Sequence, residues 1–213
     1  MPIPRTGETN QRVTETVSEI IRTVKEGGDQ AVKNYTLKFD GSLPEYYEVP
    51  RDVINDAMTE ADPAFVDAML NAIENVRDFH QRQVQEGFIH ALPNGVILGQ
   101  RVRGLERVGL YVPGGTAPLF STVLMLAVPA RLAGCHEIVM CTPPGKEGKI
   151  APAILYAARE TGIDRIFKLG GVQAIGAMAF GTESVPQVYK IFGPGNRYVM
   201  AAKQQVSVQG VAI

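Results

Sequence analysis

Cysteine and histidine are both scarce in this sequence, which holds two cysteines and three histidines in 213 residues. Cys135 and Cys141 would flank a single predicted strand, and at about 3.3 Å per residue their Cα atoms would lie roughly 20 Å apart. A disulfide needs Cα atoms within about 7 Å, so these two cysteines cannot pair within the chain. The histidines (His80, His90 and His136) are scattered, and no cysteine or histidine falls into a zinc-ligand spacing such as CxxC or HxxxH. The spacing therefore predicts no metal site.

The sequence also lacks a charge imbalance and a long apolar run. Lysine plus arginine (21) nearly balance aspartate plus glutamate (22), and no basic stripe is present that would neutralise a row of phosphates. The apolar stretch 123–130 is far shorter than the roughly 20 residues that cross a bilayer, and it contains Pro129. No basic-then-apolar signal pattern opens the chain. We therefore expect a cytoplasmic globular protein that binds neither nucleic acid nor membrane.

Residues 11–85 have a helical texture, because apolar residues recur there every three or four positions. The first helix is predicted to end at Gly27 and Gly28, and Asp29 is a candidate cap for a second helix. Asp62 and Pro63 form a cap and first-turn pair for a longer one. The apolar face of that longer helix consists of Phe65, Met69, Ile73, Val76 and Phe79. We interpret Phe79 and the methionines of the chain as core packing.

A change of period near Phe88 marks a boundary. Pro93, Asn94 and Gly95 separate the extended stretches 88–92 and 96–102, as the turn of a hairpin would. After residue 107 a short apolar strand, a loop of glycine and proline and a helical run follow one another four times. The predicted strands are 108–112, 138–141, 166–169 and 188–192, and the loops after them are 113–115, 143–145, 170–171 and 193–196.

This alternation predicts an α/β fold with a parallel sheet and helices on both faces, because parallel strands need a long return connection. Gly134, Gly162 and Gly181 stand where the C-terminal caps of the helices belong. In such sheets the loops that leave the carboxyl ends of the strands form the ligand crevice. We therefore expect all four glycine-rich loops to lie along one edge of the sheet.

Glycine loops that lead into helices favour a ligand that carries phosphate, since the backbone comes close and the positive end of a helix faces it. No loop matches GxGxxG or the Walker pattern, so each loop alone is equally compatible with plain turn geometry. Tyr111, Gln173 and Asn196 lie beside the loops and are candidate ligand contacts. The alternatives are an interior tyrosine with a satisfied hydroxyl, and helix capping or solvent contact for the two amides. Lys203, two turns into the last helix, is predicted to be a solvated surface lysine.

Cys141 lies at the ligand edge of the predicted sheet, which raises the alternative of a nucleophile that oxidises an aldehyde through a thiohemiacetal. No base stands near it in the sequence. A small buried residue at a strand end is the more common role for such a cysteine, and we favour it.

Three segments resemble one protein family. VGLYVPGGTAPLFSTVLMLAVP with the following ARLAGCHEIVMCTPP, and LGGVQAIGAMAFGTESVPQVYKIFGPGNRYVMAAK, are similar to histidinol dehydrogenases. GGDQAVKNYTLKFDG resembles the same family more loosely, so the similarity covers nearly the whole chain. The resemblance implies two successive NAD-dependent oxidations, of L-histidinol to an aldehyde and then to L-histidine, by a zinc-containing homodimer. It also implies NAD contacts at Tyr111, Gln173 and Asn196, which coincide with the candidates chosen from loop position.

The resemblance further implies an incomplete Rossmann-like NAD-binding domain at 108–213, preceded at 1–107 by a helical and hairpin region that is half of a second α/β domain. The family's zinc ligands and its Glu-His acid–base pair belong to segments that follow the equivalent of Ile213. We therefore expect no catalytic residue and no metal ligand among these 213 residues. The alternative to an enzyme portion is a noncatalytic nucleotide-binding or interaction module of the same ancestry.

Overall fold

Four parallel strands form the central sheet of the computed structural model, in the order β5-β4-β3-β6. The structure describes residues 7–41, 43–57, 62–114, 117–145 and 147–213. The strands are β3 (Arg107–Tyr111), β4 (Glu137–Thr142), β5 (Arg165–Lys168) and β6 (Lys190–Phe192). All four coincide with predicted strands to within about two residues, and the predicted parallel α/β sheet is confirmed.

Side chains alternate between the two faces of this sheet, and both faces are buried. On β3, Val108 and Leu110 enter one apolar cluster while Tyr111 enters the other. On β4, Met140 and Cys141 divide in the same way. Strands that bury both faces must be covered by helices on both sides, because each apolar surface has to be removed from water.

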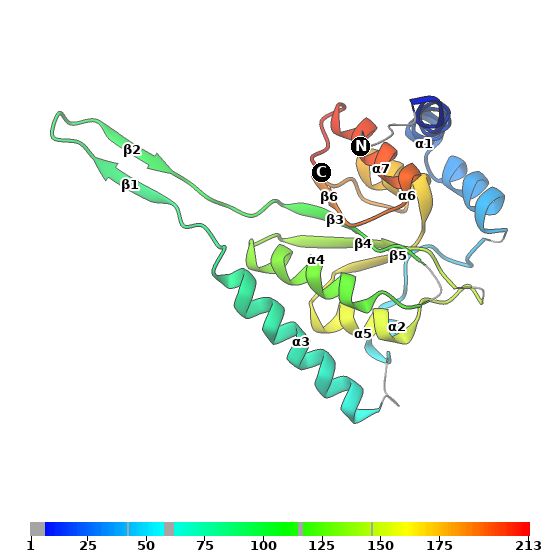
Figure 1. The fold of residues 1–213 in the computed structure, drawn as a ribbon, viewed down its shortest axis with the longest axis horizontal. Coiled ribbons are helices and arrows are strands. Elements are labelled where there is room, and N and C mark those ends of the chain that lie inside the picture. Colours follow the sequence, from blue (N-terminus) through cyan, green and yellow to red (C-terminus); the bar gives the residue numbers. More distant parts are fainter. Residues whose placement is uncertain (1–6, 42, 58–61, 115–116, 146) are drawn as a thin grey trace, which may run out of the picture.

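The helices form one layer on each face of the sheet (Figure 1). One layer contains α1 (Gly7–Asp40), α6 (Gly171–Phe180) and α7 (Arg197–Ser207), and the other contains α2 (Arg51–Asn55), α4 (Phe120–Leu132) and α5 (Pro152–Glu160). A further helix, α3 (Pro63–Gln81), packs on α4. The predicted caps Gly134, Gly162 and Gly181 all have a positive φ (75°, 74° and 77°), which glycine adopts without strain.

Both edges of the sheet are paired with other parts of the chain. The segment around Glu48 runs antiparallel to β5, with the Val49 N–H donating to the carbonyl oxygen of Ile166 at 2.8 Å. At the other edge Ala212 bridges to Lys190 of β6 in the parallel sense. These pairings satisfy backbone groups that an open sheet edge would expose.

The predicted break after the first helix is confirmed at Gly28, whose φ of 52° and ψ of −138° divide α1 into two helical pieces. Asp29 does not cap the second helical piece, as the sequence analysis predicted it would. Its carboxylate accepts hydrogen bonds from the hydroxyl and the backbone N–H of Ser184, and its own N–H donates to Glu183 at 2.8 Å. Asp29 therefore ties the kink of α1 to the loop before β6, across 154 residues of sequence.

The helix α3 follows its prediction at the start but not at the end. Asp62 accepts a hydrogen bond from the Ala64 N–H at 3.0 Å and Pro63 opens the helix, as the sequence predicts. Phe79, expected in the core, is 62% exposed, and Met125 is exposed as well. The prediction of core packing was wrong for Phe79, Met125 and Met200, which the described elements leave exposed. It is confirmed for Met69, Met140 and Met178, which are buried, while Met1 and Met58 lie outside the described residues. Among the described residues, no helix combines the length and apolar character needed to span a membrane.

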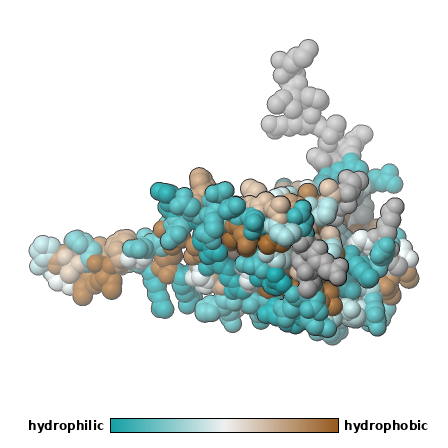
Figure 2. All heavy atoms as spheres, turned by 90° about the horizontal axis from the view of Figure 1, so that it is seen from below, coloured by the Kyte–Doolittle hydropathy of each residue, from teal (hydrophilic) through white to brown (hydrophobic). Residues whose placement is uncertain are grey.

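A two-stranded arm, β1 (Phe88–Ala91) with β2 (Ile97–Gln100), projects from the body (Figure 1) and confirms the predicted hairpin. All eight of its strand residues are exposed, and Figure 2 shows apolar surface along the arm. The register places Ile89, Ala91, Ile97 and Gly99 on one uncharged face. The division into domains at residue 107 stays a prediction, since helices that precede it pack on helices that follow it.

The Gly28 kink generates a prediction for stability. A side-chain carbon at Gly28 would meet the Glu183 carboxylate at 2.7 Å, and the positive φ is strained for other residues. G28A should lower the free energy of unfolding by about 1–3 kcal/mol, measured by urea denaturation. G145A is the matched control, because Gly145 is not a positive-φ glycine and a carbon added there would meet its nearest atom, the Lys149 backbone oxygen, at an ordinary 3.4 Å. Equal stability of the two variants would contradict the role of the kink.

Candidate functional site

The loops that follow the four strands pack tightly against one another at the carboxyl edge of the sheet. A side-chain carbon would lie 2.6 Å from Pro143 if added to Gly114 and 2.7 Å from it if added to Gly170. At Gly193 such a carbon would overlap the carbonyl oxygen of Tyr111. The predicted convergence of the loops on one edge is therefore confirmed for their described residues, while Gly115 lies outside the residues that the structure describes.

Tyr111, at the end of β3, is buried on the side of the sheet that α6 covers. Its hydroxyl accepts a hydrogen bond from the Gly171 N–H at 3.1 Å, and burial raises the pKa of the phenol. This is the arrangement of the alternative interpretation, an interior tyrosine with a satisfied hydroxyl. The bond also fixes the first residue of α6 against the end of β3.

Gln173 lies in the first turn of α6 and is 1% exposed. Its Oε1 is buried and has no hydrogen-bond partner among the described residues. A side-chain carbon at Gly171 would come within 2.7 Å of this oxygen, so only glycine leaves room for it there. An unpaired buried acceptor costs free energy, so a donor that reached Oε1 would be favoured, but this oxygen is closed to solvent in the present conformation.

Asn196 caps α7. Its Oδ1 accepts hydrogen bonds from the backbone N–H groups of Tyr198 at 3.0 Å and Val199 at 3.1 Å. This is the capping role considered as the alternative to a ligand contact, and it uses only the oxygen of the amide. The side chain is exposed, and its Nδ2 has no partner among the described residues. The amide nitrogen is therefore available to a ligand.

Lys203 is not the solvated surface lysine that its position suggested. Its side chain is 8% exposed, and Nζ donates a hydrogen bond to the Gly193 carbonyl oxygen at 3.1 Å. Burial lowers the pKa of the ammonium group. The prediction was wrong because Lys203 lies on the same face of α7 as the buried Val199 and Val206.

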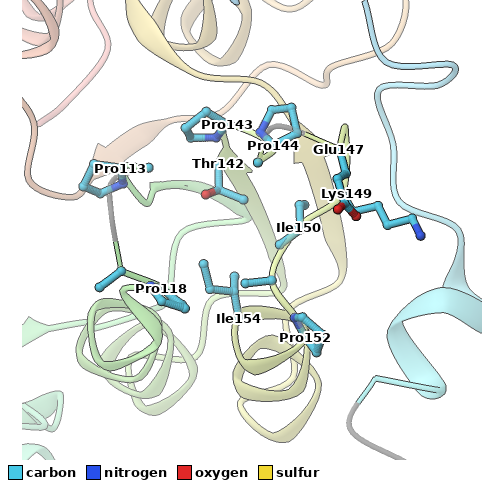
Figure 3. A pocket seen from close by; sticks show the side chains of 14 residues that line it. Pro113, Pro118, Thr142, Pro143, Pro144, Glu147, Lys149, Ile150, Pro152 and Ile154 are labelled. Carbon is cyan, nitrogen blue, oxygen red and sulfur yellow. The ribbon is translucent and has the colours of Figure 1, made fainter.

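A cavity of about 570 Å³ opens at the same edge on the α4 and α5 side (Figure 3). Thr142 points into it from the end of β4, and its buried Oγ1 has no partner in the described part of the chain. The structure thus brings Tyr111 and Gln173 together at Gly171, but none of the three predicted contacts lines this cavity. The sequence analysis missed Thr142, although a polar residue at a strand end beside a glycine-proline loop is a usable signal.

Cys141 is fully buried and its thiol is free. Burial raises the pKa of the thiol, so the thiolate that a nucleophilic role requires is disfavoured. The described residues contain no group of three or more histidine, cysteine, aspartate or glutamate side chains that would hold a metal ion.

A parallel sheet in which the first strand lies between the second and the fourth is one half of the doubly wound fold that binds dinucleotides. The fold and its glycine-rich edge therefore define a Rossmann-like α/β protein. The family model for histidinol dehydrogenase matches residues 3–213, and the chain belongs to the histidinol dehydrogenase family.

Relatives in this family are close. Histidinol dehydrogenase of Bacteroides fragilis is 53% identical over 203 residues, and that of Bacteroides thetaiotaomicron is 54% identical over 199 residues. The alignments cover 95% and 93% of this chain but 47% and 46% of the relatives. The crystal structure of histidinol dehydrogenase from Elizabethkingia anophelis is 44% identical, with a TM-score of 0.91 over all of this chain and 48% of that one. The chain spans about half the length of these relatives.

The cap at Asn196 separates two roles of one side chain. N196A should lower the free energy of unfolding by about 1 kcal/mol, because two N–H groups of α7 lose their acceptor. N196D keeps the acceptor and places a negative charge at the helix N-terminus, so its stability should stay within about 0.5 kcal/mol of the original. Urea denaturation measures both values. If N196D were destabilised as much as N196A, the oxygen would not be the capping atom.

Proposed function

We propose that this chain supplies the NAD-binding part of a histidinol dehydrogenase. The whole protein would oxidise L-histidinol through an aldehyde to L-histidine, with NAD as the oxidant. The observation that carries the proposal is the buried, unpaired Oε1 of Gln173 at the carboxyl edge of the sheet. Membership of the family supports the choice of cofactor.

The described residues fit a dinucleotide. Gln173 offers an acceptor to a hydroxyl or amide of the cofactor, and Asn196 offers a donor that its capping role leaves free. Tyr111 holds the first turn of α6 in place, and Gly193 lets the backbone approach closely. The N-termini of α6 and α7 favour the negative diphosphate. The bound cofactor would supply hydride acceptance, with one NAD reduced for the alcohol and a second NAD reduced for the hydrated aldehyde.

The same residues do not fit zinc, since the part of the chain that the structure describes gathers no ligand set. We infer that the zinc ligands and the groups that transfer protons belong to the part of the relatives' length that this chain does not cover. A noncatalytic nucleotide-binding module remains the competing function, favoured by that same partial coverage.

The protein is further proposed to act as a homodimer in the cytoplasm. The arm supports association, because a two-stranded hairpin is marginally stable alone and Ile89 is 85% exposed on its uncharged face. A surface of this kind favours contact with another protein surface.

Q173M tests the cofactor site. Methionine has a similar shape but no acceptor, so NAD binding should weaken about tenfold while stability is unchanged or slightly higher. Calorimetric titration and urea denaturation measure the two quantities. Q187M is the matched control. Gln187 lies just before β6, at the opposite edge of the sheet from the site, and its side chain donates a hydrogen bond to the Ala179 carbonyl oxygen. Unchanged NAD affinity in a folded Q173M would remove Gln173 from the site.

Turnover separates the enzyme portion from the noncatalytic module. Residues 1–213 should take up no stoichiometric zinc and form no NADH from histidinol, because we infer that the groups for zinc binding and proton transfer lie in the part of the relatives that this chain does not cover. Metal analysis and absorbance of the reduced cofactor provide the measurement, on material of confirmed intact mass. One zinc per chain with histidinol-dependent NADH would contradict the expectation. A version extended to the family's length that binds NAD without oxidising histidinol would favour the module.

A further inference from the structure

Lys203 lies inside the molecule, although lysine side chains normally keep their ammonium group in water. It shares a face of α7 with Val199, Ala202 and Val206, which are buried in the cluster that α1 and α6 also form. No acidic side chain of the described residues forms an ion pair with it. Its bond to the Gly193 carbonyl oxygen therefore provides the partner that its buried ammonium group needs.

The helix geometry explains how the two groups meet. Side chains on a helix lean toward its N-terminus, so a long side chain two turns into α7 reaches back to the loop before it. Gly193 has a φ of 125° and presses against the Tyr111 carbonyl, with no room for a side-chain carbon. Contact with Tyr111 at the end of β3 thus restricts the backbone of Gly193, and the hydrogen bond from Lys203 orients its carbonyl group.

The peptide between Gly193 and Pro194 has a carbonyl oxygen but no N–H, because proline lacks one. Turned outward, this oxygen would present partial negative charge to a ligand at the loop. Within the described residues, the backbone N–H groups of Gly195 and Asn196 have no hydrogen-bond partner. Within the described residues the loop 193–196 therefore holds two N–H groups without a partner and a Gly193 oxygen that Lys203 already engages.

We propose that Lys203 is a positioning residue for the diphosphate of the cofactor. It holds the Gly193 carbonyl inward, which keeps the loop 193–196 free of a repelling acceptor, and its buried charge favours an anion at the loop. The inference rests on the proposed NAD-binding function. Lys203 does not hold the uncharged adenosine part of the dinucleotide.

K203M removes the charge and the donor while keeping an unbranched side chain. Calorimetric titration should show NAD binding weakened about tenfold or more, because the Gly193 carbonyl is no longer held away from the diphosphate and a nearby positive charge is lost. Binding of adenosine should change by less than about twofold. K33M is the matched control, since Lys33 is exposed and lies near Arg165, where β5 begins. The K33M variant should bind NAD and adenosine as the original chain does. Equal losses for NAD and adenosine, or no loss for either, would overturn the proposal.

Two measurements without NAD keep this test separate from the proposed function. Amide hydrogen exchange should speed up in K203M at residues 195–199 and stay unchanged in α6. Inorganic pyrophosphate, followed through the amide signals of Gly195 and Asn196, should bind the original chain and not K203M. If the original chain binds pyrophosphate but no NAD, the cofactor assignment fails while the role of Lys203 stands. If K203M shows unchanged hydrogen exchange and unchanged pyrophosphate binding, the proposed role of Lys203 is overturned. K203Q replaces K203M if the latter does not fold, with the same outcomes expected.

Discussion

Successive side chains of a β-strand point to opposite faces, and in this sheet both faces are buried. Each strand must then return through a helix before the next parallel strand begins, which sends every strand in the same direction. The four loops consequently leave one edge, where the glycines at 114, 170 and 193 bring their backbones into contact with neighbouring segments. The close approach of Gly193 to Tyr111, and with it the whole candidate site, depends on this constraint.

Much of the fold was predictable from local signals. The strands are short apolar runs bounded by glycine and proline, and the cap at Asp62 is decided by residues next to it in sequence. The errors concern side chains whose surroundings come from distant segments. Phe79 carries the periodicity of a core residue, but the elements that the structure describes leave its side chain exposed. Asp29 has the composition of a cap, yet Ser184 takes its carboxylate across the fold.

The candidate site was predictable in its position more than in its chemistry. Tyr111, Gln173 and Asn196 all lie at the carboxyl edge, as the loop positions indicated. Sequence spacing does not reveal that the Asn196 oxygen is used by the helix cap while the Gln173 oxygen is left unpaired, since both facts depend on rotamers. Sequence spacing also does not show whether Lys203 is buried or solvated, because its burial depends on how α7 packs against α1 and α6.

The packing of α1 has a consequence for the order in which the molecule assembles. Its apolar residues, among them Val17 and Ile21, are covered by α6 and α7, and side chains of α1 bond to residues up to 187 positions later. A chain synthesised from its N-terminus exposes this apolar stripe until almost all of the sheet has been made. Contacts of such separation raise the contact order and slow folding. Helix α1 thus emerges before α6 and α7, onto which it packs, and its apolar surface stays uncovered until both have been made.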